Sequence, residues 1–320
     1  MRKGRGPYLY LCAYLCALVL LSATAGCRTK IQSTLNAPPT SAQIAELWVD
    51  PGRNRDLFWG VGGRALAPDP AASYTVIEMK RGGFSRGYTV KDPDGREWST
   101  KFPPEAATEV AASRILWGIG YHQPPVYYLP EWQASKATSP NPQLPARFRE
   151  RAPAFHGLES GDTWSYYENP FVGTRQLNGL LTVQAMLGNS DLKDLQNAVY
   201  TLTTPVEGVK RWYVARDLGQ TFGRSGAIDP PRGDPDVFDQ TGFILGVEGG
   251  YVRFDYHGRH RVLFERISPA DVRWVCQRLA ALSDQQRQDA FRAAGYPKAV
   301  ADRFIRRLEQ KIAEGLQLKD

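Results

Sequence analysis

Cysteine, histidine and methionine are all scarce in this sequence of 320 residues, which contains four, four and three of them. Two of the cysteines, Cys12 and Cys16, lie in an apolar N-terminal segment, so the rest of the chain has only Cys27 and Cys276. A framework of several disulfides is therefore excluded, and the fold must depend on its core. With 42% hydrophobic and 23% charged residues and no internal repeat, the composition indicates one large globular domain or two lobes. It excludes disorder, collagen and coiled coil.

Strongly one-sided charge is also missing. The formal net charge is +7, and three of the basic residues, Arg2, Lys3 and Arg5, precede the apolar N-terminal run, which leaves +4 for the rest. Basic residues elsewhere alternate with acidic ones, as between residues 303 and 311. This pattern is typical of a mixed solvated surface and argues against a nucleic-acid-binding stripe.

Residues 1–27 have the features of an export signal: a basic start, an apolar run over residues 8–21, and small residues directly before Cys27. The junction resembles the cleavage site of bacterial lipoproteins, in which Cys27 would be diacylated and become the N-terminus. Residues 28–45 are then expected to be a flexible tether, because they are polar and rich in proline, and the protein to be lipid-anchored in the cell envelope. An uncleaved membrane anchor is the alternative, because about 18 residues nearly span a bilayer.

Residues 46–130 are predicted to form a small lobe built on an antiparallel sheet. Alternating patterns predict strands at 74–79, 88–91 and 96–102, with a glycine-rich turn after the first and an Asp-Pro-Asp-Gly turn after the second. A helix is expected to follow over residues 104–119, where a glycine ends it.

The remaining chain divides into a connecting region and a second lobe. Five prolines between residues 130 and 153 predict a long loop or lid within a connecting and hinge region at 131–173. Residues 174–320 are expected to form a mainly helical lobe that carries the catalytic and metal-binding loops, with helix caps at Ser268 and Ser283. The predicted fold is α+β and bilobal.

Features of a nucleotide-binding site occur together in the first lobe. Lys101 ends the third predicted strand, and Glu105 and Glu109 follow on the predicted helix. A lysine at such a position holds phosphate charge, and a glutamate on the helix fixes the lysine. Glycines let backbone amides approach phosphates closely, and the glycine-rich turn contains Gly82, Gly83, Ser85 and Gly87.

The second lobe supplies candidates for catalysis. A predicted apolar helix at 176–187 is followed by Asp191 and Asn197, then by two strands and Asp217 in the run Asp-Leu-Gly-Gln-Thr-Phe-Gly. Asp191 would orient or deprotonate an acceptor hydroxyl, while Asn197 and Asp217 would hold a metal ion that bridges the phosphates. The alternative is that both aspartates only stabilise turns.

In this order, the motifs resemble those of atypical kinases, namely HipA-type toxin kinases, secretory-pathway Golgi kinases and type II phosphatidylinositol 4-kinases. The last two groups share an Asp-x-Gly-x-x-Phe metal motif with residues 217–222. The resemblance covers roughly residues 74–280 and implies ATP as co-substrate with Mg or Mn. In these families the metal-binding amide usually follows the loop aspartate by five residues; here that residue is Gln196, and Asn197 follows by six, so both stay candidates. Lys193 matches a basic or histidine residue of the families.

Two other kinds of site fit parts of the sequence less well. Ser85 lies in a Gly-x-Ser-x-Gly pattern, with Asp217 and His257 or His260 downstream in the order of a hydrolase triad. That nucleophile elbow needs a helix after the turn, whereas the pattern here predicts a strand. Asp255 and the two histidines suggest metal ligands, but neighbouring arginines oppose a bound cation.

The sequence therefore predicts an ATP-dependent phosphotransferase that acts on a hydroxyl of an envelope protein, glycan or lipid. The competing prediction is a non-catalytic envelope lipoprotein that uses the same fold to bind a ligand or a partner.

Overall fold

The computed structural model describes residues 30–320 except 81, 83, 136–143, 152–154 and 158. The predicted export signal and Cys27 lie outside these residues, and so does Gly83 of the glycine-rich turn. In the part of the chain that is described, no helix combines the length and the apolar character needed to cross a bilayer.

The first described residues are folded, so the prediction of a flexible tether over residues 28–45 is wrong in two places. Strand β1 (Gln32–Ser33) pairs in parallel with β9 (Glu168–Asn169), and α2 (Ser41–Ala45) begins at a capping box made by Thr40. The pairing partner of β1 lies 136 residues away in the sequence. Local composition cannot reveal such a distant partner, which is why the segment has the pattern of a linker.

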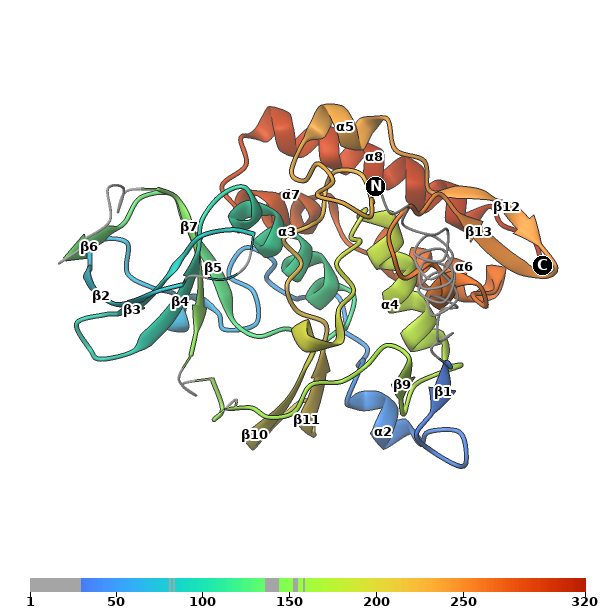
Figure 1. Cartoon of the computed structure of the whole chain (residues 1–320), viewed down its shortest axis with the longest axis horizontal. Helices are drawn as coiled ribbons and strands as arrows, with labels where there is room; N and C mark the ends of the chain where they lie inside the picture. Colours follow the sequence, from blue (N-terminus) through green and yellow to red (C-terminus); the bar gives the residue numbers. More distant parts are fainter. Residues whose placement is uncertain (1–29, 81, 83, 136–143, 152–154, 158) are drawn as a thin grey trace, which may run out of the picture.

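A six-stranded sheet forms the first lobe (Figure 1). Its strands are β2 (Ser73–Met79), β3 (Tyr88–Lys91), β4 (Glu97–Lys101), β5 (Val126–Leu129), β6 (Gln133–Ser135) and β7 (Ala146–Glu150). They are arranged β5-β7-β4-β3-β2-β6, and each neighbouring pair is antiparallel except β2 and β6. The tight turn between β3 and β4 requires Gly95, whose φ of 86° is unfavourable for other residues.

Strand β7 corrects the prediction that residues 131–173 are only a loop and hinge. It lies inside the sheet between β5 and β4, where Phe148 packs edge-on against Trp98 with ring centroids 6.0 Å apart. The sequence Arg147-Phe148-Arg149 sends the ring to one face of the sheet and both guanidinium groups to the other. The first lobe therefore includes this strand. The sequence does not indicate it, because the prolines on both sides are typical of a loop.

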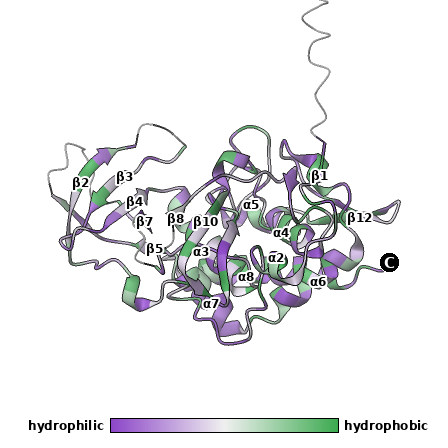
Figure 2. Cartoon of the chain, turned by 90° about the horizontal axis from the view of Figure 1, so that it is seen from below, coloured by the Kyte–Doolittle hydropathy of each residue, from purple (hydrophilic) through white to green (hydrophobic). Residues whose placement is uncertain are grey.

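The second lobe is mainly helical, as the sequence predicts. Ser268 and Ser283 form capping boxes at two of its helices. The helix α6 packs against both α4 and α8, and the largest core lies among them. Figure 2, seen from another direction, again has β2, β3 and β4 at one end and α4 and α6 toward the other. The helices of this lobe are α4 (Arg175–Met186), α5 (Pro235–Asp239), α6 (Pro269–Ala280), α7 (Asp284–Arg292) and α8 (Lys298–Leu316).

Helix α3 (Glu105–Gly118) lies between the two lobes (Figure 1). It packs against β5 and β7 of the sheet and against α7 of the helical lobe. The chain turns away after the helix at Gly120, which has a φ of 108°. Because both sides of the helix are covered, even its charged residues are buried, namely Glu105, Glu109 and Arg114.

Short strands and 3-10 helices connect these parts. The connecting strands are β8 (Glu159–Ser160), β10 (Ala198–Val206), β11 (Val209–Val214), β12 (Ile244–Glu248) and β13 (Tyr251–Phe254). The 3-10 helices are η1 (Arg64–Leu66), η2 (Asp194–Gln196) and η3 (Arg261–Phe264). Strands β8, β10 and β11 form one sheet, and β12 and β13 form a separate hairpin. The predicted α+β class, with a small sheet lobe and a mainly helical lobe, is confirmed.

Candidate active site

Lys101 ends strand β4, and its side chain meets the helix that follows. The ammonium Nζ lies 2.8 Å from Glu109 Oε2 and 3.4 Å from Glu105 Oε2, and it also contacts the carboxylate of Asp217. The two glutamates are four residues apart, so they share one face of α3. Both reach the lysine, and Glu109 is the closer partner. A strand, a helix and the loop after β11 thus meet at one cation.

Glu109 is a buried carboxylate that several cations share. It is 3% exposed, and its Oε1 lies 3.0 Å from Arg147 Nε and 3.7 Å from Arg149 Nη1. Burial alone would raise the pKa of Glu109, but Arg147, Lys101 and Arg149 outweigh burial and hold that pKa well below its ordinary value. Burial lowers the pKa of Lys101, while Glu109 and Asp217 more than reverse this, so that pKa is raised. Both groups are therefore charged at neutral pH.

The sequence does not single out three basic residues that surround this pair. Arg147 and Arg149 project from β7 toward the Glu109 carboxylate. Lys80 follows β2, and its ammonium donates to the carbonyl oxygen of Thr100 at 2.8 Å. Burial, together with the nearby arginines, lowers the pKa of Lys80 to about 7. For Arg147 and Arg149, the alternation of arginine and phenylalanine in the sequence of β7 could have indicated that both arginines lie on one face of a strand.

The two candidate aspartates come from different loops and meet at one glutamine. Asp191 follows α4, and Asp217 follows β11 with a φ of 58°, in the left-handed region that residues other than glycine rarely adopt. Gln196 Nε2 donates to Asp191 Oδ2 at 2.6 Å and to Asp217 Oδ2 at 3.0 Å. Lys101, Asp191 and Asp217 therefore lie together at one place, as the order of the motifs predicts. Their roles in binding and catalysis stay predictions.

Asn197 points away from Asp191 and Asp217, and this corrects the prediction that Asn197 binds a metal ion. Its side chain is 1% exposed, and its Nδ2 donates to the carbonyl oxygen of Trp164 at 3.2 Å. Gln196, the other candidate, lies between the two carboxylates instead. A spacing of five residues from Asp191 thus selects the residue that faces Asp217.

The donor set near Asp217 can be tested for its fit to a divalent ion. Within residues 30–320 as described, no three His, Cys, Asp or Glu side chains gather into a metal site. Gln196 Oε1, however, is buried and has no hydrogen-bond partner among the described residues. A buried oxygen without a partner is rare in folded proteins and calls for a partner such as an ion, and hard divalent ions prefer carboxylate and amide oxygens. The Asp217 carboxylate and the Gln196 amide oxygen are thus donors of the types that suit Mg or Mn, and the amide would have to turn so that Oε1 takes the place of Nε2 beside Asp217.

The glycine-rich turn joins two strands, which contradicts the hydrolase alternative. Strand β3 begins directly after the turn, at Tyr88, where a nucleophile elbow would need a helix. A Cβ atom at Gly87 would collide with the carbonyl of Thr100, so this glycine permits the close approach of the next strand. Gly82 is exposed, and Ser85 is 8% exposed with a hydroxyl that has no partner among the described residues.

The two histidines of the alternative sites make their contacts elsewhere. His257 Nε2 lies 2.7 Å from Asp255 Oδ1, and His260 Nδ1 lies 2.8 Å from the hydroxyl of Tyr167. Burial lowers the pKa of His260. The structure therefore gives neither histidine the contact with Asp217 that a hydrolase triad would require.

A cleft of about 290 Å³ opens beside Asp191. Lys193 lines it and has its Nζ 2.8 Å from Asp191 Oδ1. Arg232 crosses between the lobes in the wall of this cleft: its Nη1 donates to Glu105 Oε1 at 2.6 Å, and its guanidinium lies 3.8 Å from the ring centre of Phe84. The cleft is thus bounded by both lobes and has Asp191 in its lining.

The elements occur in the order of a bilobal kinase-like fold. A small sheet ends in Lys101, the next helix holds Glu109, and a helical lobe carries Asp191 and Asp217 on separate loops. The side chain of Gln196 connects these two loops.

No protein-family model matches the chain, and no curated protein matches it by sequence. Similar solved structures include a Golgi casein kinase, with 12% identity and a TM-score of 0.40 over 79% of this chain and 74% of that chain. The Golgi casein kinase with Mn/ADP bound has 13% identity and a TM-score of 0.37 over 95% of this chain and 88% of that chain. The Helicobacter pylori proinflammatory kinase CtkA has 11% identity and a TM-score of 0.35 over 78% of this chain and 100% of that chain.

Proposed function

We propose that this protein is a phosphotransferase that moves the terminal phosphoryl group of ATP to an acceptor hydroxyl. The observation that carries the proposal is the meeting of three functional groups from three separate elements. The Lys101 ammonium contacts the Asp217 carboxylate, and Gln196 connects that carboxylate to Asp191. Residues that only stabilised their own turns would have no reason to converge in this way.

Each of these residues has a task that follows from its contacts. Lys101, held by Glu109, offers its charge to the phosphates of the nucleotide, and the cations around it strengthen that attraction. Asp217 and Gln196 would hold a divalent ion, which neutralises phosphate charge when bound. Asp191 lines the cleft of about 290 Å³, where the acceptor would bind and where this carboxylate accepts the proton of the attacking hydroxyl. A bond then forms between that oxygen and the terminal phosphorus, and the bond from this phosphorus to the oxygen of the departing diphosphate breaks.

The acceptor and the cellular location belong to the same proposal. Cys27, which lies outside the described residues, would carry the lipid that anchors the protein to an envelope membrane. The proposal is supported by the small residues before Cys27 in the sequence. Acceptors on an envelope protein, glycan or lipid would then be within reach. Mass spectrometry of the N-terminal peptide tests this part, since an intact segment 1–27 in the mature protein contradicts it.

The test of the catalytic proposal is a panel of three variants assayed with radiolabelled ATP, Mn and envelope extract. Asp191→Asn should bind nucleotide normally but transfer phosphate about 10²–10⁴-fold more slowly, because the lost group acts on the acceptor. Asp217→Asn should weaken nucleotide binding only when the metal is present, and Lys101→Met should weaken it with or without metal. Glu46→Gln, which changes a glutamate at a surface ion pair with Arg211, is the control.

The non-catalytic alternative gives different results in the same panel. A protein that binds ATP with Mn at 100 times the dissociation constant gains about 2.7 kcal/mol of stability, and its melting temperature rises. Such a rise without transfer to any acceptor or to the protein itself would favour the alternative. If neither a rise nor transfer occurs with any nucleotide, the proposal is wrong.

A further inference from the structure

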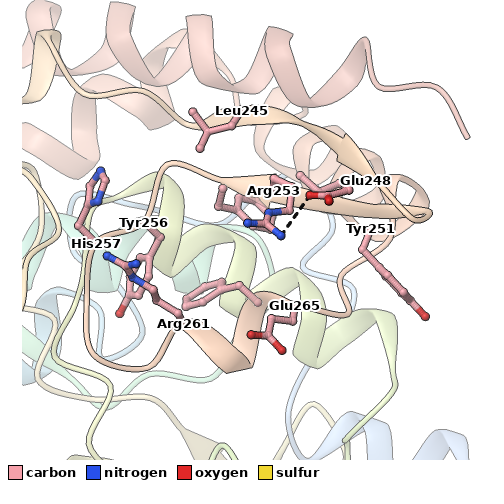
Figure 3. A pocket seen from close by; sticks show the side chains of 11 residues that line it. Leu245, Glu248, Tyr251, Arg253, Tyr256, His257, Arg261 and Glu265 are labelled. Carbon is pink, nitrogen blue, oxygen red and sulfur yellow. Dashed lines mark ion pairs between the residues drawn. The ribbon is translucent and has the colours of Figure 1, made fainter.

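A second groove lies in the helical lobe, away from the residues described above. It has a volume of about 290 Å³ and is formed by the hairpin of β12 and β13 together with the chain from Tyr256 to Glu265. Figure 3 shows the side chains that line it. Neither the predicted nucleotide site nor the cleft beside Asp191 includes these side chains.

The floor of the groove is aromatic and its upper wall is an exposed aliphatic side chain. Tyr256 and Phe264 are buried, and their ring centroids lie 4.3 Å apart. Leu245 is 70% exposed and also lines the groove. The register of the hairpin passes from the pair Ile244 and Phe254 to the pair Gly246 and Arg253, so Leu245 is the extra residue of a β-bulge. A bulge re-aims a side chain, and here it leaves an uncovered apolar residue at the groove.

Polar and charged side chains of both signs line the groove. Figure 3 shows His257 and Arg261 at one end and Glu248 toward the other, with Glu265 below. Glu248 pairs with Arg253 at 3.2 Å, whereas Arg261 has no ion-pair partner among the described residues. Arg261 and Glu265 line the same groove four residues apart and do not form an ion pair with each other. The guanidinium therefore keeps its donors available for a ligand.

Tyr256 separates this groove from the candidate active site. A Cβ atom added at Gly258 would collide with the Tyr256 hydroxyl and lie 2.8 Å from Cβ of Ser190, so this part of the chain packs against the loop that carries Asp191. The ring forms the groove floor on one side, and the hydroxyl is buried on the other. A ligand in the groove would thus be neighbour to the loop without occupying the nucleotide site.

We propose that this groove binds a small ligand with a flat apolar body and one anionic group, the anion lying at Arg261 and the body between Leu245 and the aromatic floor. The volume is at the lower limit for small-molecule sites, which suits a ligand of one or two rings. Glu265, which has no ion-pair partner among the described residues, disfavours a second anionic group on the ligand. The site therefore selects monoanions over both neutral compounds and dianions.

Binding of naphthalene-2-carboxylate to the full chain, measured by ligand-detected NMR, tests the proposal. A ligand of this size is expected to bind with a Kd of about 1 mM or tighter. Arg261→Gln should raise the Kd about tenfold, because a charge-assisted hydrogen bond is lost. The matched control is Arg266→Gln, which removes the same charge from an exposed neighbour that does not line the groove and should leave the Kd unchanged.

Two further arms separate the charge argument from adventitious binding. 2-Naphthol and naphthalene-2,6-dicarboxylate should both bind more weakly than the monocarboxylate, and Glu265→Gln should improve binding of the dicarboxylate. ADP with Mn should not displace the probe, so the result does not depend on the proposed phosphotransfer. Equal effects of the two arginine variants, equal binding of 2-naphthol, displacement by ADP, or no saturable binding would each overturn the proposal.

Discussion

Replacing Glu109 with glutamine tests the charge network at the centre of the candidate site. Its carboxylate is 3% exposed and balances Lys101, Arg147 and Arg149. Removing one partner of a buried ion pair leaves the others without compensation and typically costs about 3–5 kcal/mol. We therefore expect Glu109→Gln to lower the free energy of unfolding by about that amount at pH 7. Urea unfolding followed by tryptophan fluorescence measures the loss as a lower midpoint.

The lowered pKa of Glu109 also determines how the free energy of unfolding should change with pH. The pKa of Glu109 is held below its ordinary value in the folded protein, so the unfolded state binds the proton more readily. The stability that the ionised carboxylate contributes is present in full above the unfolded pKa of about 4.3 and is lost as pH falls through the folded pKa. Wild-type stability should therefore fall in acid more steeply than that of Glu109→Gln, and the gap between them should narrow below about pH 4.

The matched control is a glutamate that is 19% exposed and pairs with an exposed arginine at the surface. Glu46 Oε2 lies 2.8 Å from Arg211 Nη2, and the arginine side chain is 51% exposed. Surface pairs contribute about 0–1 kcal/mol, so Glu46→Gln should have little effect. A similar loss in both variants would show that burial and shared cations do not distinguish Glu109. A gap that stays constant down to pH 3 would refute the linkage argument.

The other predictions concern single side chains. Gln196→Ala should weaken Mn-dependent ADP binding in calorimetry. Asn197→Ala should leave this binding intact and lower the free energy of unfolding by about 1–3 kcal/mol, the cost of losing a buried hydrogen bond. The reverse pattern would make Asn197 the metal ligand. Burial lowers the pKa of Lys311 to about 7, so the free energy of unfolding should rise from pH 7 toward pH 10. Lys311→Met should remove part of that rise, and Lys80, whose pKa is also lowered, supplies another part. A Lys311→Met variant with the pH profile of the wild type in urea unfolding contradicts this. Ser85 should not react with a fluorophosphonate, and Ser85→Ala should keep most nucleotide binding; stoichiometric labelling would refute the kinase proposal.

The parts of the site that the sequence predicts are those set by local pattern. The position of Lys101 at a strand end, with Glu109 on the next helix, follows from alternation in the strand and from helical spacing. Asp217 likewise follows a strand with a clear pattern. Lys101 and Glu109 meet because the helix begins only four residues after the strand ends, which is why the sequence indicates this pairing, whereas Asp217 comes from 116 residues further along the chain.

The missed parts depend on contacts between distant segments. Strand β7 is only five residues long and is surrounded by prolines, and its identity as a strand comes from pairing with β4 and β5. Arginine is usually found at the surface, but Arg147 is fully buried. Its burial is possible because Glu109 compensates its charge. The pairing of β1 with β9 is equally non-local. In these cases the partner, and not the segment itself, determines the structure.

A simple geometric cause explains why Gln196, and not Asn197, faces Asp217. The 3-10 helix η2 ends at Gln196, and Asn197 then has extended backbone angles, with φ of −76° and ψ of 148°, at the start of strand β10. Successive residues of an extended chain send their side chains to opposite sides, so only one of the two can face Asp217. Asn197 packs inward on Trp164, and Gln196 faces Asp191 and Asp217 instead. The additional methylene of glutamine lets its amide reach both carboxylates, whereas the shorter asparagine side chain has less reach, so a Gln196→Asn variant should keep one of these contacts and lose the other.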